Sequence, residues 1–324
     1  MSNILILDIG ARNKLVRYFK KELLGRGNVV VADCSRLAPA LYDADKYYIV
    51  PRCMEKNYVD EIKKICIEEK ISLIIPLLED DLLVISKNKN EFEKLGIKCL
   101  ISDYDIIEKC FDKYIMFEYF QNNGFKTQLT YKDIKNFMKD NKNKKIQFPV
   151  FIKPNKGCGS NSTDVVENLE MLEVIFKRND DFLIQELMSG REIGVDVYVD
   201  IISKEVVAIF AKEKIRMLGG ETDKSLSFKD EKLFTIIKQF VEKMNLIGVI
   251  DIDVFEVDDE YYISEVNPRF GGGYLHAYAC GVNFPKYIIE NMMNKINNPC
   301  VGKYEDDICM MKYKDVKIID LKER

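Results

Sequence analysis

The first hundred residues show short apolar runs separated by amphipathic segments. Apolar runs predict strands at residues 4–7, 29–32, 46–50, 73–75 and 98–101. Apolar positions at helical spacing predict helices at residues 14–24, 58–69 and 82–95. Strands that alternate with helices in this way form parallel sheets with right-handed crossovers. Residues 1–104 are therefore expected to form an N-terminal α/β domain.

The pattern changes in the rest of the chain. Helices are predicted at residues 104–124 and 229–244, with a further helix inside the polar stretch 126–145. Strands are predicted at residues 148–154, 182–185, 192–202, 206–211, 249–257 and 261–265. Antiparallel strands with helices on one side favour an α+β arrangement. We expect a first lobe at residues 105–185, a second lobe at 186–300 and a tail without an interpretable motif at 301–324.

Composition narrows the class of protein. A chain of 324 residues exceeds the size at which one core stops growing, near ~250–300 residues, so several subdomains are expected. Hydrophobic residues make up 47% and charged residues 31%, which excludes disorder and fibrous repeats. A net charge of −4 without a basic run gives no attraction to nucleic acid. The opening apolar run is too short for a signal sequence or a membrane span.

Cysteine and histidine usage restricts the chemistry further. Nine cysteines without a C-x-x-C pair indicate reduced thiols and therefore a cytoplasmic protein. His276 is the one histidine, and tryptophan is absent. A serine triad or a histidine-based zinc site therefore has almost nothing from which it could be built.

The predicted hairpin in the second lobe carries the strongest chemical signal. Period-two alternation places Asp253, Glu265 and Asn267 on one face, where three hard oxygen donors could hold Mg²⁺ against phosphate oxygens. The alternative is a surface hairpin whose acids are only solvated. The flanks favour a phosphate site, since Arg269 follows at once and the glycines at 271–273 let backbone amides approach an anion.

A second phosphate signal comes from Lys153, which ends an apolar strand. A buried ammonium group needs an anionic partner, and a phosphate would supply one. The turn that follows contains Gly157, Gly159 and Ser160, whose amides and hydroxyl could fold over phosphates. A plain hairpin turn is the alternative.

The segment Gln185, Glu186, Leu187 and Met188 lies between the two predicted lobes. Its backbone could offer donors and acceptors to an adenine edge, with apolar contact from its last two residues. Glu192 could accept hydrogen bonds from ribose hydroxyls. An ordinary strand and an exposed acid are the alternatives for these positions.

Gly10 and Asp33 follow the first two predicted strands. Dinucleotide-binding folds use a glycine-rich turn there and an acid about 20 positions further on. That motif needs three glycines, and only Gly10 is present. A glycine that ends a strand beside a cleft is the simpler interpretation.

Taken in order, these motifs resemble the ATP-grasp superfamily, in particular its carbamoyl-phosphate-synthase-like branch in a short form of the large chain. The resemblance runs from the N-terminal domain to Asn283. It is strongest at residues 264–274 and 280–285, and residues 219–224 also match this branch. Carbamoyl phosphate synthases carry two such units and a glutaminase partner, whereas this chain has one unit and no amidotransferase motif.

The resemblance implies a pre-ATP-grasp domain followed by two lobes that close on ATP and Mg²⁺, with Mn²⁺ as a possible substitute. It implies phosphate-binding lysines at Lys113 and Lys153, an adenine hinge at Glu186 and a ribose contact at Glu192. It also implies metal ligands at Asp253, Glu265 and Asn267 and a catalytic arginine, Arg269, that faces the transferred phosphate.

The expected function is an ADP-forming ligase that joins a small carboxylate, such as an amino acid, to an amine through an acyl phosphate. The alternatives are an enzyme that uses bicarbonate or carbamate, and an ATP sensor without turnover. No nucleic-acid or membrane partner is expected, and a homodimer is one possible assembly. Substrate contacts are expected between the N-terminal domain and the second lobe, with His276 also open to a structural role: Gly10, Arg12, Glu79, Arg216, Glu221, Gly272 and His276.

Overall fold

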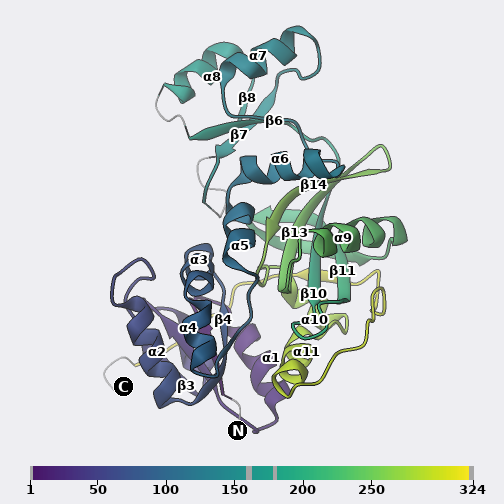
Figure 1. Cartoon of the computed structure of the whole chain (residues 1–324). Coiled ribbons are helices and arrows are strands. Elements are labelled where there is room, and N and C mark those ends of the chain that lie inside the picture. Colours follow the sequence, from purple (N-terminus) through teal and green to yellow (C-terminus); the bar gives the residue numbers. More distant parts are fainter. Residues whose placement is uncertain (1–2, 158–162, 178–180, 321–324) are drawn as a thin grey trace.

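The computed structural model describes residues 3–157, 163–177 and 181–320, which fold around three sheets (Figure 1). The N-terminal sheet is parallel, in the order β3-β2-β1-β4-β5. Alternate residues of its central strand enter two different apolar clusters, so the strand is buried on both faces. This part confirms the predicted α/β fold. Its strands are β1 (Asn3–Leu7), β2 (Val29–Asp33), β3 (Lys46–Ile49), β4 (Ile71–Pro76) and β5 (Lys98–Cys99), and its helices are α1 (Asn13–Leu23), η1 (Pro39–Asp43), α2 (Tyr58–Glu68), α3 (Glu79–Lys87) and α4 (Lys89–Lys94).

Two predicted helices are each divided in the structure. The prediction at 82–95 is wrong at Asn88, which separates α3 from α4 and donates its side-chain amide to the carbonyl of Val84 at 2.8 Å. The prediction at 104–124 is wrong at Asp112, which separates α5 (Tyr104–Phe111) from α6 (Lys113–Asn123). The Asp112 carboxylate caps α6 by accepting from two backbone amides. Both breaks follow from side chains that compete for backbone hydrogen bonds.

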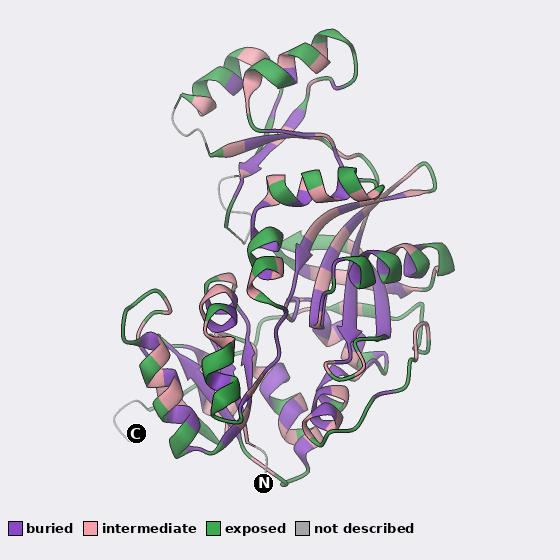
Figure 2. Ribbon diagram, viewed as in Figure 1, coloured by how far each residue is buried: buried purple, intermediate pink, exposed green. Residues whose placement is uncertain are grey.

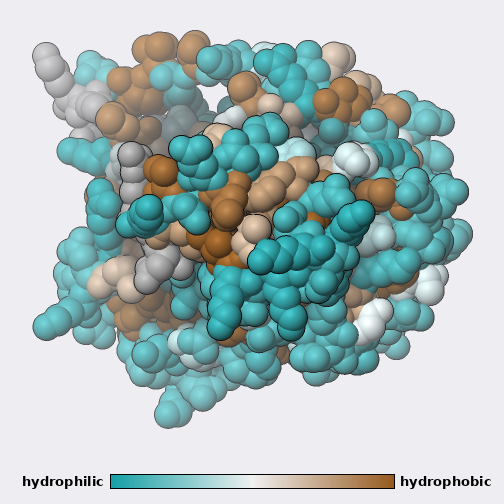
Figure 3. Space-filling view, turned by 90° about the horizontal axis from the view of Figure 1, so that it is seen from above, coloured by the Kyte–Doolittle hydropathy of each residue, from teal (hydrophilic) through white to brown (hydrophobic). Residues whose placement is uncertain are grey.

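The small sheet is four-stranded, in the order β6-β9-β7-β8. It has an apolar cluster of its own, and α7 and α8 lie on its outer side (Figure 1). These helices are mostly exposed or half-buried, whereas β1, β2 and β4 of the N-terminal sheet are almost entirely buried (Figure 2). Seen from above, the surface is mainly hydrophilic with scattered hydrophobic side chains (Figure 3). The elements are β6 (Thr130–Tyr131), α7 (Ile134–Lys142), β7 (Val150–Pro154), β8 (Asp164–Val166), α8 (Leu169–Phe176) and β9 (Phe182–Glu186).

The large sheet is antiparallel, in the order β14-β13-β10-β11-β12-β15. Its inward residues and those of α9, α10 and α11 belong to the largest apolar cluster, which continues into the N-terminal sheet. The elements are β10 (Arg191–Val199), β11 (Val206–Leu218), β12 (Glu221–Phe228), α9 (Glu231–Lys243), β13 (Gly248–Val257), β14 (Glu260–Asn267), α10 (Tyr274–Ala279), α11 (Phe284–Met292) and β15 (Cys309–Met311).

Helix α1 docks the N-terminal sheet onto the large sheet. Tyr18 stacks on Tyr278 with ring centroids 3.6 Å apart, and Phe19 makes an edge contact with Phe270. The Glu22 carboxylate accepts a hydrogen bond from the Tyr278 hydroxyl. This docking brings the residues before α1 against the loop after β14. No helix in the described ranges has the length and apolarity that a membrane crossing requires.

Candidate active site

The hairpin of β13 and β14 closes through Asp258 and Asp259, which both have positive φ, at 50° and 60°. Such turns match the twist of the paired strands and fix their register. Asp253 pairs with Glu265 across the hairpin, and Asn267 lies two residues further along the same face. The structure therefore brings the three predicted metal-binding side chains together.

The charged face continues across the neighbouring strands. Lys214 of β11 contacts Asp253 at 2.7 Å and Glu192 of β10 at 3.0 Å. Burial alone would lower the pKa of Lys214, but these two carboxylates raise it above its ordinary value. Gly194 makes room for the lysines, because a Cβ there would lie 3.2 Å from the Lys214 side chain. Glu192 is thus held by Lys214, which was not predicted as a site residue.

Lys212, the second missed lysine, forms a buried ion pair with Asp196. Both lysines lie beyond residue 211, where the predicted strand ends. Charged residues continue the alternation of the strand beyond residue 211, and this pattern would have extended the predicted strand.

Lys153 reaches this face from β7 of the small sheet. Its Nζ lies 3.7 Å from a carboxylate oxygen of Glu265, and its side chain is 10% exposed. Burial lowers the pKa of Lys153, while Glu265 raises it in part. Burial would raise the pKa of Glu265, but Lys153 and Lys113 bring it below its ordinary value. The two sheets therefore share an ion pair whose lysine is buried and whose glutamate is half-buried.

Lys113 begins α6, and its Nζ donates to the carbonyl oxygen of Gly157 at 2.7 Å. Gly157 has a φ of 106°, which suits glycine. The predicted phosphate-binding turn continues through Gly159 and Ser160, which lie outside the described residues.

Arg269 is held in place by three neighbours. It donates to the Asn267 side-chain oxygen at 3.1 Å and to the Phe270 carbonyl at 3.0 Å, and it lies 3.5 Å from Asp251. A Cβ on Gly271 would come within 2.4 Å of the Asp251 carboxyl carbon, so only glycine fits there. The guanidinium is therefore fixed beside the hairpin acids.

A cavity of about 540 Å³ lies next to Arg269, between α1 and the loop after β14. Three of the predicted substrate contacts, Arg12, Glu221 and Gly272, line it. Burial and the nearby Arg269 lower the pKa of Arg12 to about 10. Arg12 donates to the Phe270 carbonyl at 3.1 Å.

The other predicted substrate contacts do not line this cavity. Gly10 donates its amide to Asp33 at 2.9 Å, which accounts for the glycine and acid pattern without a dinucleotide. Arg216 lies 3.5 Å from Asp223. Glu79 begins α3. Burial raises its pKa, and the nearby charge of Lys113 opposes that rise.

His276 is buried and lies away from the cavity. Its Nε2 contacts the Ile308 carbonyl oxygen at 2.9 Å, so this nitrogen carries the proton, and Nδ1 accepts from the Ser225 hydroxyl at 2.8 Å. Burial and Lys212 lower its pKa to about 4. A structural role accounts for these contacts.

His276→Gln tests this role. The unfolded chain binds a proton at His276 below pH 6.5, while the folded protein resists protonation down to about pH 4. Stability therefore falls as the pH drops through that window, by up to roughly 3 kcal/mol from this group. Urea unfolding at pH 7 and pH 5 should show a smaller loss for the variant. An equal loss in both proteins would contradict the assignment.

The predicted adenine hinge begins at the end of β9. The Gln185 side chain is buried and donates to Thr130 at 2.9 Å, and the Glu186 carboxylate accepts from the Leu129 amide at 3.2 Å. These two side chains therefore form hydrogen bonds within the small sheet and its flanking residues. Leu187 and Met188 follow in a segment that is neither helix nor strand.

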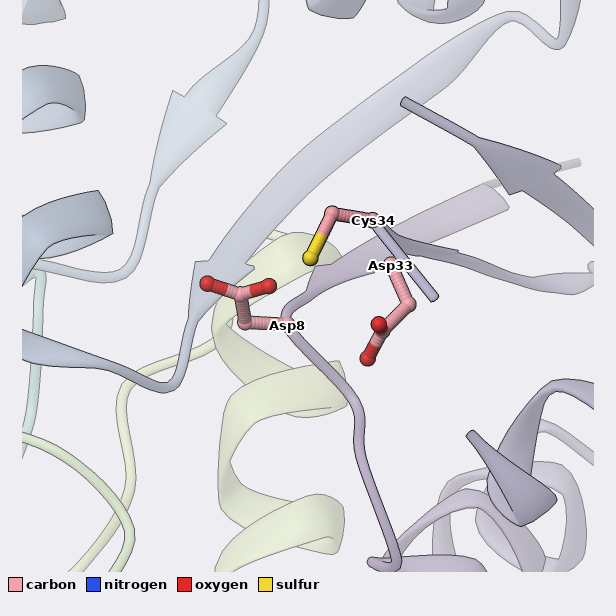
Figure 4. A group of neighbouring side chains, drawn as sticks. All are labelled: Asp8, Asp33 and Cys34. Carbon is pink, nitrogen blue, oxygen red and sulfur yellow. The ribbon is translucent and has the colours of Figure 1, made fainter. Parts of the chain in front are cut away.

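Asp8, Asp33 and Cys34 form a separate group, with ligand atoms within 4.8 Å of one another (Figure 4). The Asp8 carboxylate and the Cys34 sulfur point toward each other in this view. Both Asp33 oxygens accept backbone hydrogen bonds, from Gly10 and Ser35. The two Asp33 oxygens therefore cap the turns after β1 and β2, and this role explains the position of Asp33.

Oxygen donors from one hairpin and cations from both sheets thus form a site suited to a metal-bound polyphosphate. Residues 4–100 match the family description "PylC-like, N-terminal domain", and residues 110–273 match "ATP-grasp domain". The chain belongs to the ATP-grasp family.

Relatives agree with this assignment. A carbamoyl-phosphate synthase of Methanobrevibacter smithii is 26% identical over 257 residues, which cover 74% of this chain and 67% of that protein. Two carbamoyl phosphate synthase large chains are much longer, and the chain spans 18% and 23% of them.

Solved structures share the fold. The biotin carboxylase domain of Hydrogenobacter thermophilus 2-oxoglutarate carboxylase, crystallised with MgADP and bicarbonate, superimposes with a TM-score of 0.76 at 15% identity, covering 94% of this chain and 73% of that one. An L-amino acid ligase from Bacillus licheniformis gives 0.70 at 17% identity, covering 92% and 75%. At these identities the two structures show that the chain shares their fold.

Proposed function

We propose that the protein is an ATP- and Mg²⁺-dependent ligase that joins a small carboxylic acid to an amine. A carboxylate oxygen attacks the γ-phosphorus of ATP, the bond to the β,γ-bridging oxygen breaks, and ADP leaves. The amine nitrogen then attacks the acyl carbon, phosphate leaves, and the amine proton passes to solvent. The observation that carries the proposal is the meeting of the hairpin acids, Lys153 and Arg269 beside the cavity lined by Arg12.

The donor set fits Mg²⁺, because Asp253, Glu265 and Asn267 offer hard oxygen ligands from paired strands. Lys214 contacts one oxygen of Asp253 and Lys153 lies near one oxygen of Glu265, so each carboxylate has a second oxygen that could face Mg²⁺. Bound Mg²⁺ would supply positive charge that screens the phosphates.

Protein side chains act by positioning and neutralisation, as phosphoryl transfer requires. Lys153 and Lys113 would hold the phosphates, and the fixed guanidinium of Arg269 would face the transferring group. Arg12 would hold the substrate carboxylate in line. A nucleophilic side chain is not needed in this scheme. In this proposal residues 105–185 and 186–300 act as two lobes.

ATP should bind at least about tenfold more tightly than GTP if Leu187 and Met188 read the base. Backbone groups that match the adenine edge meet reversed donors and acceptors on guanine, which leaves buried polar groups unpaired. Competition binding with both nucleotides measures the ratio. Equal affinity for ATP and GTP would contradict the assignment of Leu187 and Met188 as the adenine hinge.

The likeness to carbamoyl-phosphate synthase favours bicarbonate or carbamate as a second candidate acid. ADP release separates the candidates when it is measured with bicarbonate alone, with amino acids in bicarbonate-free buffer, and with each of these plus ammonia or an amino-acid amine. The proposal expects release that depends on an organic carboxylate. Release with bicarbonate alone supports the second candidate, and binding of ATP without release under every mixture supports a sensor.

A further inference from the structure

The C-terminal segment, residues 309–317, lies along the cavity beside α1. It starts as β15, which pairs with β12, so Met311 lies opposite Lys224. The backbone amide of Lys312 donates to the Asp223 carbonyl at 2.9 Å. Five residues later Lys317 forms an ion pair with Asp43 of the N-terminal region. The segment thus bridges the large sheet and the N-terminal sheet, although its sequence carries no motif.

This segment supplies one side of the cavity. The lining residues of this segment, opposite Arg12 and residues of α1, are Met310, Met311, Lys312, Tyr313 and residues 315–317. The volume of about 540 Å³ falls in the range of small-molecule sites, about 300–1,000 Å³. The cavity is therefore lined by α1 and Arg12 before it, by the loop after β14, by Glu221 at the start of β12, and by this segment.

The charges on these walls are opposite and lie close together. Arg12 keeps guanidinium donors beyond the one that the Phe270 carbonyl accepts, since the group carries five N–H bonds. Glu221 lies near it and contacts Lys312 at 2.8 Å. Burial would raise the pKa of Glu221, but Lys312 and Arg12 bring it below its ordinary value, so the carboxylate stays ionised.

Gly272 leaves room for this acid. A Cβ on Gly272 would lie 3.0 Å from the Glu221 carboxyl carbon, so a larger residue would push the acid away. An ionised acid and a cation with spare donors match the two charges of a zwitterion. The apolar side chains of Tyr18, Leu275 and Met310 line part of the remaining surface, and polar and charged side chains such as Asn13 and Arg17 line the rest.

We propose that the cavity binds a small amino acid with an apolar side chain, with its carboxylate on Arg12 and its ammonium on Glu221, and that residues 309–317 form the wall that selects it. Lys312 is a positioning residue that holds Glu221. This inference rests on the proposed ligase function and names the substrate class of the same site. It assigns specificity to a segment that neither matched family description covers.

The test compares neighbouring lysines of the segment. Lys314 does not line the cavity, so Lys314→Met is the matched control for Lys312→Met. ADP release is measured with glycine, L-alanine, L-valine, L-leucine and L-phenylalanine at saturating Mg-ATP. Lys312→Met should raise the KM for the preferred amino acid about tenfold with kcat within about twofold, and Lys314→Met should leave both unchanged.

A second pair of variants guards against a folding effect. Tyr313 lines the cavity and is 79% exposed, whereas Ile318 is 87% exposed and lies beyond it. Tyr313→Ala should shift the order of preference among the five amino acids, and Ile318→Ala should not. Identical profiles for all four variants and the parent would overturn this inference while leaving the ligase proposal intact. Absence of ADP release with every acid would instead reject the ligase proposal.

Discussion

Glu265→Gln is expected to lower the rate of ADP formation by about a thousandfold or more. The substitution keeps the shape of the side chain but removes the negative charge that Lys153 faces at 3.7 Å and that the proposed Mg²⁺ site requires. The phosphates would then lose a correctly placed cation. The measurement is kcat for ADP release at saturating Mg-ATP, with the melting temperature recorded alongside.

The hairpin offers a matched control on the same strand. Glu260 lies at the start of β14 and forms exposed ion pairs with Lys126 and Lys232, far along the strand from Asn267. Glu260→Gln should keep activity within about twofold, because exposed pairs contribute little. If Glu265→Gln retained more than about a tenth of the parent activity at ordinary Mg²⁺ concentration, the metal assignment would be wrong.

Arg269→Lys is expected to lower kcat by about a hundredfold with a much smaller change in ATP affinity. The guanidinium is held by the Asn267 side chain and the Phe270 carbonyl, and this leaves its fork in one orientation. A lysine keeps the charge but cannot reproduce two directed donors. The loss should therefore fall on the step in which charge develops on the transferring phosphoryl group.

Single-turnover ADP formation and equilibrium ATP binding separate these two effects. Arg36→Lys, an exposed arginine outside the cavity, is the control and should behave like the parent. A variant with unchanged kcat and weakened ATP binding would show that Arg269 only binds nucleotide.

Local patterns predicted much of the fold. Period-two and helical spacing located the strands of the N-terminal sheet and the hairpin that carries Asp253 and Glu265, because both signals lie within a few residues. Helices α8, α10 and α11 were also missed, whereas two missed strands, β12 and β15, depend on distant partners. β12 is polar, with Ser225 and Ser227 buried against the charged face, and β15 is three residues that acquire strand structure by pairing with β12.

The candidate site likewise contains residues that local patterns predict and residues that depend on distant contacts. The hairpin acids could be predicted because strand geometry alone sets their face. The place of Arg12 beside Arg269 depends on the docking of α1 against Phe270, a tertiary contact that spacing does not encode. The partners of His276 come from β12 and from the residue before β15, neither of which was predicted.

Trapping with hydroxylamine tests directly whether the protein forms an acyl phosphate from ATP and a carboxylic acid. The enzyme is incubated with Mg-ATP, hydroxylamine and one carboxylic acid at a time, and hydroxamate and ADP are both measured. An acyl phosphate would be captured as a hydroxamate, so hydroxamate is expected in equal amount to ADP, with both dependent on ATP and on the acid. ATP hydrolysis at the same rate with and without acids, with no hydroxamate from any of them, would contradict it.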